Sequence, residues 1–262
     1  MTSPRARVPR ILVVAGSDSG GGAGIQADIK TVMAMGGYAT TAITAITAQN
    51  TVGITQVQVL DPALVVAQID AVLADIGADA IKIGMLGSAA AAHAVAERLA
   101  QEDARVPMVF DPVMAASSGV TLADAGTIAA FERLMRLATL VTPNIPELAR
   151  LSPDGAEALA RRIGTCVLVK GGHGDGMMLV DRLVAADGTS CAWRNPRIET
   201  RHTHGTGCTL ASAIAVGLAR GEPIEASIAA GRRFVRAALA SGPGLGRGAG
   251  PMNHAAAGLA VA

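Results

Sequence analysis

Short apolar runs that alternate with helical patterns constrain the fold of this chain more than any other feature. The runs are too short to form helices: 11–15, 80–85, 108–113, 140–142 and 166–170. Between them lie stretches with one apolar face at helical spacing, such as Val65, Ile69, Val72 and Ile76. Strands that alternate with helices form parallel sheets with right-handed crossovers. The sequence therefore predicts an α/β protein with a mostly parallel sheet, to which the runs 177–185 and 190–193 add a more antiparallel edge.

No repeat, linker or change in composition divides the 262 residues, a length that suits one α/β domain. We predict a single domain over 1–262, in which 1–9 and the glycine- and alanine-rich segment 242–262 are peripheral. Only 16% of the residues are charged, 2% are aromatic and the net charge is +1. Because this composition provides neither a strong field nor many stacking platforms, we expect no nucleic-acid and no membrane partner.

The cysteines and the first residues indicate the compartment. Cys166, Cys191 and Cys208 lie far apart, without the paired spacing of a zinc site, and their odd number argues against a disulfide framework. The start of the chain is basic and then apolar like a signal peptide, but its apolar run is short and ends in Ser-Asp-Ser. We expect a cytoplasmic protein whose cysteines are in the reduced, thiol form.

A glycine-bracketed turn, His204-Gly205-Thr206-Gly207-Cys208, opens directly into about three turns of uncharged helix that end at Arg220 and Gly221. Glycines allow backbone N–H groups to converge on one point, and the helix adds the positive end of its dipole there. The turn is thus a candidate anion hole that contains a thiol, with Gly205, Gly207 and Cys208 as candidate catalytic residues. The alternative is an ordinary glycine loop before a buried helix.

The first loop, GSDSGGGAG, follows a predicted strand, yet it lacks the Gly-Lys-Ser/Thr of a P-loop and the spacing of a dinucleotide fingerprint. A Rossmann oxidoreductase is therefore the least favoured class. In the following helix Asp28 lies on the apolar stripe, so its carboxylate either points into a pocket or complements the helix dipole. Gln49 stands at the polar end of the run 38–51 and either reads a polar ring or is a solvated loop residue.

Oxygen-bearing and cationic residues follow three other predicted strands. Asp111 precedes Pro112, and Asn144 and Glu147 lie in a proline-rich loop, where carboxylate and amide oxygens suit a hydrated Mg²⁺ ion. Lys170 precedes two glycines and suits a phosphate. The alternatives are that Asp111 forms a turn with Pro112 and that Glu147 is a first-turn helix residue.

Seven segments stand in order over about 11–239: AGSDSGGGAGIQAD, TAITAQNT, KIGML, FDPVM, TPNIPE, KGGH and THGTGCTLASA. The tail segment GPGLGRGAGPMNH belongs to the same set. Together they resemble the bacterial hydroxymethylpyrimidine/phosphomethylpyrimidine kinases of thiamine biosynthesis, a branch of the ribokinase superfamily. The resemblance implies a three-layer α/β/α fold in which helices flank the mostly parallel central sheet. It also implies ATP and Mg²⁺ as cofactors, and phosphorylation first of 4-amino-5-hydroxymethyl-2-methylpyrimidine and then of its monophosphate.

The resemblance also implies roles for individual residues. A small-molecule pocket has two polar contacts and a mostly apolar wall: Asp28, Gln49, Ala23, Met85, Val113 and Thr47, the last where valine is usual. Residues near Mg²⁺ and the phosphates match as well: Asp111 and Glu147 for the metal, and Asn144, Lys170 and Thr206 for the nucleotide or phosphates. Cys208 stands where most of the superfamily has an aspartate base.

Because a helix N-terminus lowers the pKa of a thiol, we expect Cys208 to be partly ionised at neutral pH and to orient or deprotonate the substrate hydroxyl. Alternatively, it is only a small residue that admits substrate. Lys170 and the backbone N–H groups of 205–208 would hold the γ-phosphate. Two other functions stay open, a pyridoxal kinase of vitamin B6 salvage and a catalytically silent pyrimidine sensor. The half-exposed strand pattern at 54–60 favours a homodimer.

Overall fold

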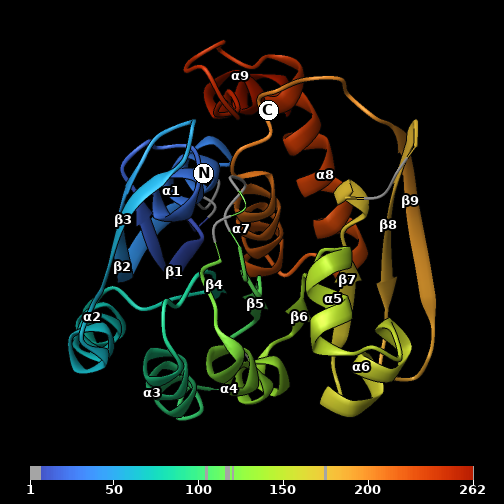
Figure 1. Ribbon diagram of the computed structural model, residues 1–262. Helices are drawn as coiled ribbons and strands as arrows, with labels where there is room; N and C mark the ends of the chain where they lie inside the picture. Colours follow the sequence, from blue (N-terminus) through green and yellow to red (C-terminus); the bar gives the residue numbers. More distant parts are fainter. Residues whose placement is uncertain (1–6, 104–105, 116–118, 120, 174–175, 262) are drawn as a thin grey trace, which may run out of the picture.

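A continuous sheet of nine strands passes through the centre of the computed structural model, which describes residues 7–103, 106–115, 119, 121–173 and 176–261 (Figure 1). The strand order is β3-β2-β1-β4-β5-β6-β7-β8-β9, parallel from β2 to β7 and antiparallel at both edges. The strands are β1 Arg10–Asp18, β2 Tyr38–Gln49, β3 Ile54–Val59, β4 Ala80–Ile83, β5 Met108–Phe110, β6 Leu140–Val141, β7 Cys166–Val169, β8 Met178–Val184 and β9 Ser190–Pro196. The predicted parallel sheet and its antiparallel edge at β8 and β9 are confirmed.

Helices cover both faces of this sheet. Figure 1 shows α2, α3 and α4 on one side and α1, α7 and α8 on the other. The helices are α1 Gly24–Ala34, α2 Pro62–Asp75, α3 Ala89–Leu99, α4 Ala125–Leu137, α5 Ile145–Leu151, α6 Ala156–Ile163, α7 Thr206–Ala219, α8 Ile224–Ala240 and α9 His254–Val261. The predicted three-layer α/β/α architecture is therefore confirmed (Figure 1).

Strand β1 shows how the sequence produces two cores. Because successive side chains of a strand point to opposite faces, Leu12 and Val14 pack with α2, α3 and α4, whereas Ile11 and Val13 pack with α1 and α7. All of these side chains are buried, as the unbroken apolar run predicts for a central parallel strand. Helix α7 is buried on nearly every side, which explains why it carries no charge.

The tail differs from its prediction. Segment 242–262 contains α9 and the buried hydrophobic side chains of Met252 and Ala257, which pack against Phe234 of α8. Gly258 approaches Ala34 of α1 so closely that a Cβ at 258 would lie 2.9 Å from the Ala34 carbonyl oxygen. The expectation of a peripheral tail is therefore wrong for 251–258. A helix of alanine and glycine docks by close backbone approach and leaves no hydrophobic periodicity in the sequence.

The parallel topology brings loops that are distant in sequence to one edge of the sheet. The loop after β1, the residues after β4, β5 and β7, and the first turn of α7 all lie at this edge, because α7 packs on β1, β4 and β5. A bridge between Asn144 and Lys170 and another between His204 and Pro251 tie these loops together. Within the described residues, no helix is long and apolar enough to cross a membrane.

Candidate active site

The turn before α7 meets the first glycine loop backbone to backbone. Gly205 has φ of 84°, a left-handed conformation that favours glycine, and it caps α7 without a side chain. A Cβ at Gly205 would lie 1.9 Å from the carbonyl oxygen of Gly22, and a Cβ at Gly22 would lie 2.4 Å from the His204 ring. A larger residue would require the backbone to move at position 205 and the His204 ring to move at position 22. The glycines of both motifs thus serve one contact.

Asp18, which the sequence analysis did not single out, organises this contact. Its carboxylate accepts hydrogen bonds from the backbone N–H groups of Gly20, Gly22 and Ala23, at 2.8, 3.0 and 2.9 Å. Nε2 of His204 lies 2.9 Å from Oδ2 of Asp18, so the side chain connects the loop to the turn. Burial by itself raises the pKa of Asp18, but His204 and these N–H groups outweigh burial and lower it. The only sequence signal for this role was an aspartate inside a glycine loop.

Several residues predicted to contact substrate lie beside Asp18 and His204. Nε2 of Gln49 is 3.1 Å from Nε2 of His204, and Oε1 of Gln49 accepts from the Thr47 hydroxyl at 3.1 Å. Ala23 belongs to the same loop through its bond to Asp18. Met85 lies nearby, since its methyl group would be 2.7 Å from a Cβ at Gly16. The structure thus brings four of the predicted pocket residues to the ends of β1, β2 and β4.

A second cluster surrounds the N-terminus of α7. Nζ of Lys170 lies 2.5 Å from Oδ1 of Asp111, which also accepts from the Thr142 hydroxyl at 3.0 Å. A Cβ at Gly207 would lie 3.2 Å from Nζ of Lys170 and 3.3 Å from Oδ2 of Asp111. The cation, the carboxylate and the first turn of α7 therefore face one another, as expected for a phosphate site. Val113 follows Asp111 and donates its N–H to the Asp111 carbonyl at 2.8 Å.

Asn144 and Glu147 form a reciprocal cap at the start of α5. The Asn144 side chain accepts from the Glu147 N–H, and the Glu147 carboxylate accepts from the Asn144 N–H, both at 2.8 Å. The alternative interpretation of Glu147 as a first-turn helix residue is confirmed. Burial raises the pKa of Glu147, opposed by Lys170 and reinforced by Asp111, so its carboxyl group lies in the field of the second cluster.

Cys208 lies half-buried in the first turn of α7. Burial raises the pKa of its thiol to about 11, and Asp28 and Asp111 act in the same direction, against Lys82 and the N–H of Gly24. The prediction of a partly ionised thiol at neutral pH is therefore wrong for this structure. Loss of hydration outweighs the helix N-terminus.

Asp28 is completely buried, and both of its oxygens have partners. Oδ2 lies 2.8 Å from Nζ of Lys82, which is also completely buried, and Oδ1 accepts from the Ser212 hydroxyl at 2.7 Å. Contact between Asp28 and a ligand stays a prediction that would require one of these pairs to open. Lys82 had no predicted role, although a lysine in the middle of a four-residue buried strand was a signal in the sequence.

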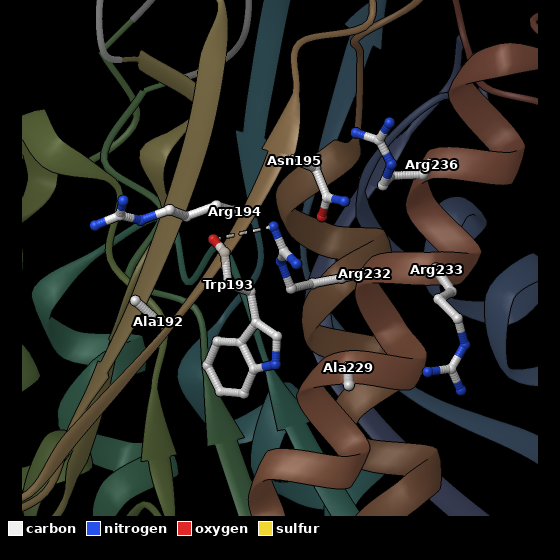
Figure 2. A pocket seen from close by; sticks show the side chains of 8 residues that line it. All are labelled: Ala192, Trp193, Arg194, Asn195, Ala229, Arg232, Arg233 and Arg236. Carbon is white, nitrogen blue, oxygen red and sulfur yellow. Dashed lines mark hydrogen bonds between the residues drawn. The ribbon is translucent and has the colours of Figure 1, made fainter.

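A separate groove of about 610 Å³ lies between β9 and α8 and contains none of the predicted site residues. Figure 2 shows that Trp193 and Asn195 face α8, whereas Ala192 and Arg194 lie on the other side of the strand. Arg232 pairs with Asp181 at 2.6 Å, and Arg236 donates to the Pro196 carbonyl at 2.8 Å. Two of the groove's cations are thus held by the protein itself.

Comparison with known proteins agrees with this geometry. The model of the family described as phosphomethylpyrimidine kinase matches residues 18–253. Hydroxymethylpyrimidine/phosphomethylpyrimidine kinase of Streptomyces coelicolor is 44% identical, with 97% of this chain and 98% of the relative covered. The thiamine biosynthesis bifunctional protein ThiED of Geobacter sulfurreducens is 47% identical over 95% of this chain, which spans 53% of that longer protein.

Among solved structures, the ADP complex of pyridoxal kinase from Bacillus subtilis is similar, with a TM-score of 0.85 and 32% identity. The match covers 97% of this chain and 100% of the pyridoxal kinase. The fold is therefore shared with kinases of more than one small-molecule ring. The family match, by contrast, spans most of the chain and includes both clusters of the candidate site. The chain belongs to the phosphomethylpyrimidine kinase family.

Proposed function

We propose that this protein is an ATP-dependent kinase that phosphorylates 4-amino-5-hydroxymethyl-2-methylpyrimidine and then its monophosphate, in thiamine biosynthesis. The observation that carries the proposal is the convergence of Lys170, Asp111 and the first turn of α7 in a chain of this family. Backbone N–H groups at a helix N-terminus and a lysine are suited to a transferring phosphate.

The site residues form two groups, one that binds ATP and one that binds the pyrimidine. Lys170 and the N–H groups of 205–208, which include Thr206, bind the γ-phosphate of ATP. Gln49 reads the polar edge of the ring, while Ala23, Thr47, Met85 and Val113 bound the pocket. The protonated thiol of Cys208 orients the hydroxymethyl group. Phosphoryl transfer is dominated by positioning and charge neutralisation, and the proton is lost late, so a thiol with a raised pKa suits this orienting role.

The residues near Lys170 fit Mg²⁺ bound chiefly by water and phosphate oxygens. Within the described part of the chain, no group of three or more His, Cys, Asp or Glu side chains could hold a metal. Oδ1 of Asp111 is engaged by Lys170 and Thr142, which leaves Oδ2 facing Gly207. Mg²⁺ usually binds one or two carboxylates and keeps several waters. Asp111 would hold the ion, supported by Glu147, and Asn144 keeps Glu147 in place. The ion would neutralise phosphate charge.

Pyridoxal kinase is the second candidate function, because a solved structure of that activity shares the fold at 32% identity. An amide, a carboxylate and an apolar wall would serve either ring. The curated relative from Streptomyces coelicolor, at 44% identity, favours the pyrimidine.

One assay tests the function. Purified protein with ATP and Mg²⁺ is offered hydroxymethylpyrimidine, its monophosphate and pyridoxal separately, and the products are identified by mass. We expect turnover on both pyrimidines. Turnover on pyridoxal alone would assign the protein to vitamin B6 salvage. No turnover on any of the three acceptors would support a pyrimidine sensor.

A cytoplasmic homodimer completes the proposal. Strand β3 forms the edge of the sheet, and exposed apolar side chains such as Ile46 and Val57 lie on β2 and β3. An exposed edge strand is suited to pairing with a second subunit. Light scattering on the wild type and on a Val57→Lys variant would test this interface; an unchanged dimer in the variant would contradict it.

A further inference from the structure

A completely buried ion pair joins β4 to α1, and its lysine has no part in the function proposed above. Lys82 of β4 and Asp28 of α1 are 2.8 Å apart and neither is exposed at all. The second oxygen of Asp28 accepts from Ser212 of α7 at 2.7 Å. A Cβ at Gly84 would lie 2.8 Å from Nζ of Lys82, so the site has no room for solvent on that side. The pair therefore joins three elements in a closed space.

Stability does not explain such a pair. Removing two charges from water costs several kcal/mol per ion, and apolar residues of similar volume often replace a buried pair with no loss of stability. A pair of this kind is expected where its charge or its geometry is used. Burial by itself lowers the pKa of Lys82, but Asp28, Cys208 and Asp111 raise it above its ordinary value, so Lys82 stays an ammonium ion.

The pair is aligned with the thiol through two adjacent helices. Ser212 follows Cys208 by one turn of α7, and Asp28 follows Gly24 by one turn of α1. Ser212 donates its hydroxyl to Asp28 at 2.7 Å. The ion pair thus joins α1 to α7 one turn along α7 from Cys208.

We propose that Lys82 is a positioning residue for Cys208. Paired with Asp28, which is bonded to Ser212 one turn after Cys208, it holds α7 in place below the thiol and supplies a positive charge that favours the thiolate. Three charged groups from other elements also act at Cys208: Asp28 of α1, Asp111 after β5 and Lys170 after β7. Both carboxylates oppose ionisation of the thiol, so Lys82 offsets them from beneath. The role of Cys208 in transfer rests on the proposed function, but the effect on the thiol does not.

The test measures the alkylation rate of each cysteine by iodoacetamide from pH 7 to 10, with peptide-level mass spectrometry. Exposed Cys191 is the control within the same molecule. In Lys82→Met we expect alkylation of Cys208, relative to Cys191, to fall about tenfold at each pH, because thiolate is the reactive form and one pKa unit changes its fraction tenfold. An unchanged ratio would overturn the proposal.

Two further variants separate charge from packing. Ser212→Ala keeps both charges and should leave the Cys208 ratio within about twofold of the wild type; a loss as large as that of Lys82→Met would show that packing alone is at work. If Lys82→Met does not fold, Lys82→Met/Asp28→Asn leaves no lone buried charge. Because the loss of Asp28 partly offsets the loss of Lys82, it should slow alkylation of Cys208 by less than about tenfold. Faster alkylation, or an unchanged rate, would contradict the proposal.

Turnover separates this proposal from the function itself. With active protein, Lys82→Met should lower kcat on hydroxymethylpyrimidine with little change in the KM for ATP, because Lys82 is paired with Asp28, whereas Lys170 of the nucleotide cluster is paired with Asp111. If the wild type is inactive on all acceptors, the proposed function fails while the alkylation result still decides the role of Lys82.

Discussion

Nε2 of His204 lies 2.9 Å from Oδ2 of Asp18, although 186 positions separate the two residues in the chain. Asp18 accepts three backbone N–H groups of its own loop as well. The shape of the glycine loop and the place of the anion-binding turn therefore depend on a single carboxylate.

Replacing Asp18 by Asn should lower the free energy of unfolding by about 1–3 kcal/mol at pH 7, because an amide retains one acceptor for several donors. The pKa of Asp18 is lowered in the folded state, so its contribution is present above the unfolded value of 3.8 and is lost as pH falls through the folded value. Urea unfolding at pH 7 and pH 3 should thus show a difference that shrinks in acid.

Asp61→Asn is the matched control for Asp18→Asn. Asp61 caps α2 at the surface, where asparagine caps equally well, so its free energy of unfolding should stay within about 0.5 kcal/mol of the wild type. A difference for Asp18→Asn that is as small as this, or one that persists at pH 3, would contradict the account of Asp18.

Alanine at the two turn glycines should separate folding from phosphate binding. Gly205→Ala combines a positive φ with a Cβ 1.9 Å from a carbonyl oxygen, so we expect a loss of more than about 2 kcal/mol in the free energy of unfolding. Gly207→Ala has no such strain but places a methyl group against Lys170 and Asp111. It should fold normally and lose ATP affinity, measured by calorimetry. Equal thermal stability of the two variants would refute this distinction.

Cys208→Ala should slow the first phosphoryl transfer about a hundredfold, in line with loss of a positioned group at a hydroxyl, and the second transfer much less. The acceptor of the second step is already an anion and needs no orientation by a thiol donor. Single-turnover assays on each acceptor would measure both steps, with Cys191→Ala as the control. Equal losses in both steps would count against the orienting role.

Asp111→Asn should raise the Mg²⁺ concentration needed for half-maximal turnover by about tenfold or more, because an amide oxygen binds Mg²⁺ more weakly than a carboxylate. Asp124→Asn, at the cap of α4, is the control. The same Mg²⁺ dependence in the wild type and in Asp111→Asn would remove Asp111 from the metal site.

His254 provides a pH test of the tail. Burial and the charge of Lys30 lower its pKa to about 4, against a hydrogen bond with Met252. Between the unfolded value of 6.5 and about 4, the unfolded chain binds a proton that the folded protein does not, so the free energy of unfolding falls as pH falls, by on the order of 3 kcal/mol in total.

His254→Gln should flatten this slope between pH 6.5 and 4 while keeping a partner for Thr209, whose hydroxyl lies 2.9 Å from the ring nitrogen. Exposed His93→Gln should leave the slope unchanged. Chemical denaturation across this pH range would reveal either outcome, and an unaltered slope in His254→Gln would disprove the assignment.

The sequence predicted what depends on local pattern. Strand β1 and helix α7 follow from apolar runs and a glycine boundary, and Lys170 and Asp111 follow from strand ends that a parallel sheet must bring together. Pairings across the chain could not be read this way. Two examples are the pairs Asp18–His204 and Lys82–Asp28. Each depends on which distant segments the fold brings together, and no periodicity in the sequence specifies that.

The thiol of Cys208 shows a different limit of prediction from sequence. The position of Cys208 at a helix N-terminus was correctly predicted, but the sign of its pKa shift was not, because burial depends on the neighbours that cover it. The prediction for the segment that contains α9 was wrong for a related reason. A helix of alanine and glycine is buried only where a complementary backbone surface exists.

The contact between Gly22 and Gly205 also determines when the site can exist during folding. The glycine loop with Gly22 and the turn with Gly205 each lie on an element that can acquire its own secondary structure. Neither binds anything until almost the whole intervening chain is in place. Contacts of such sequence separation form late, after the entropy of closing a long loop has been lost. During refolding, nucleotide binding should therefore return after the helical circular dichroism signal.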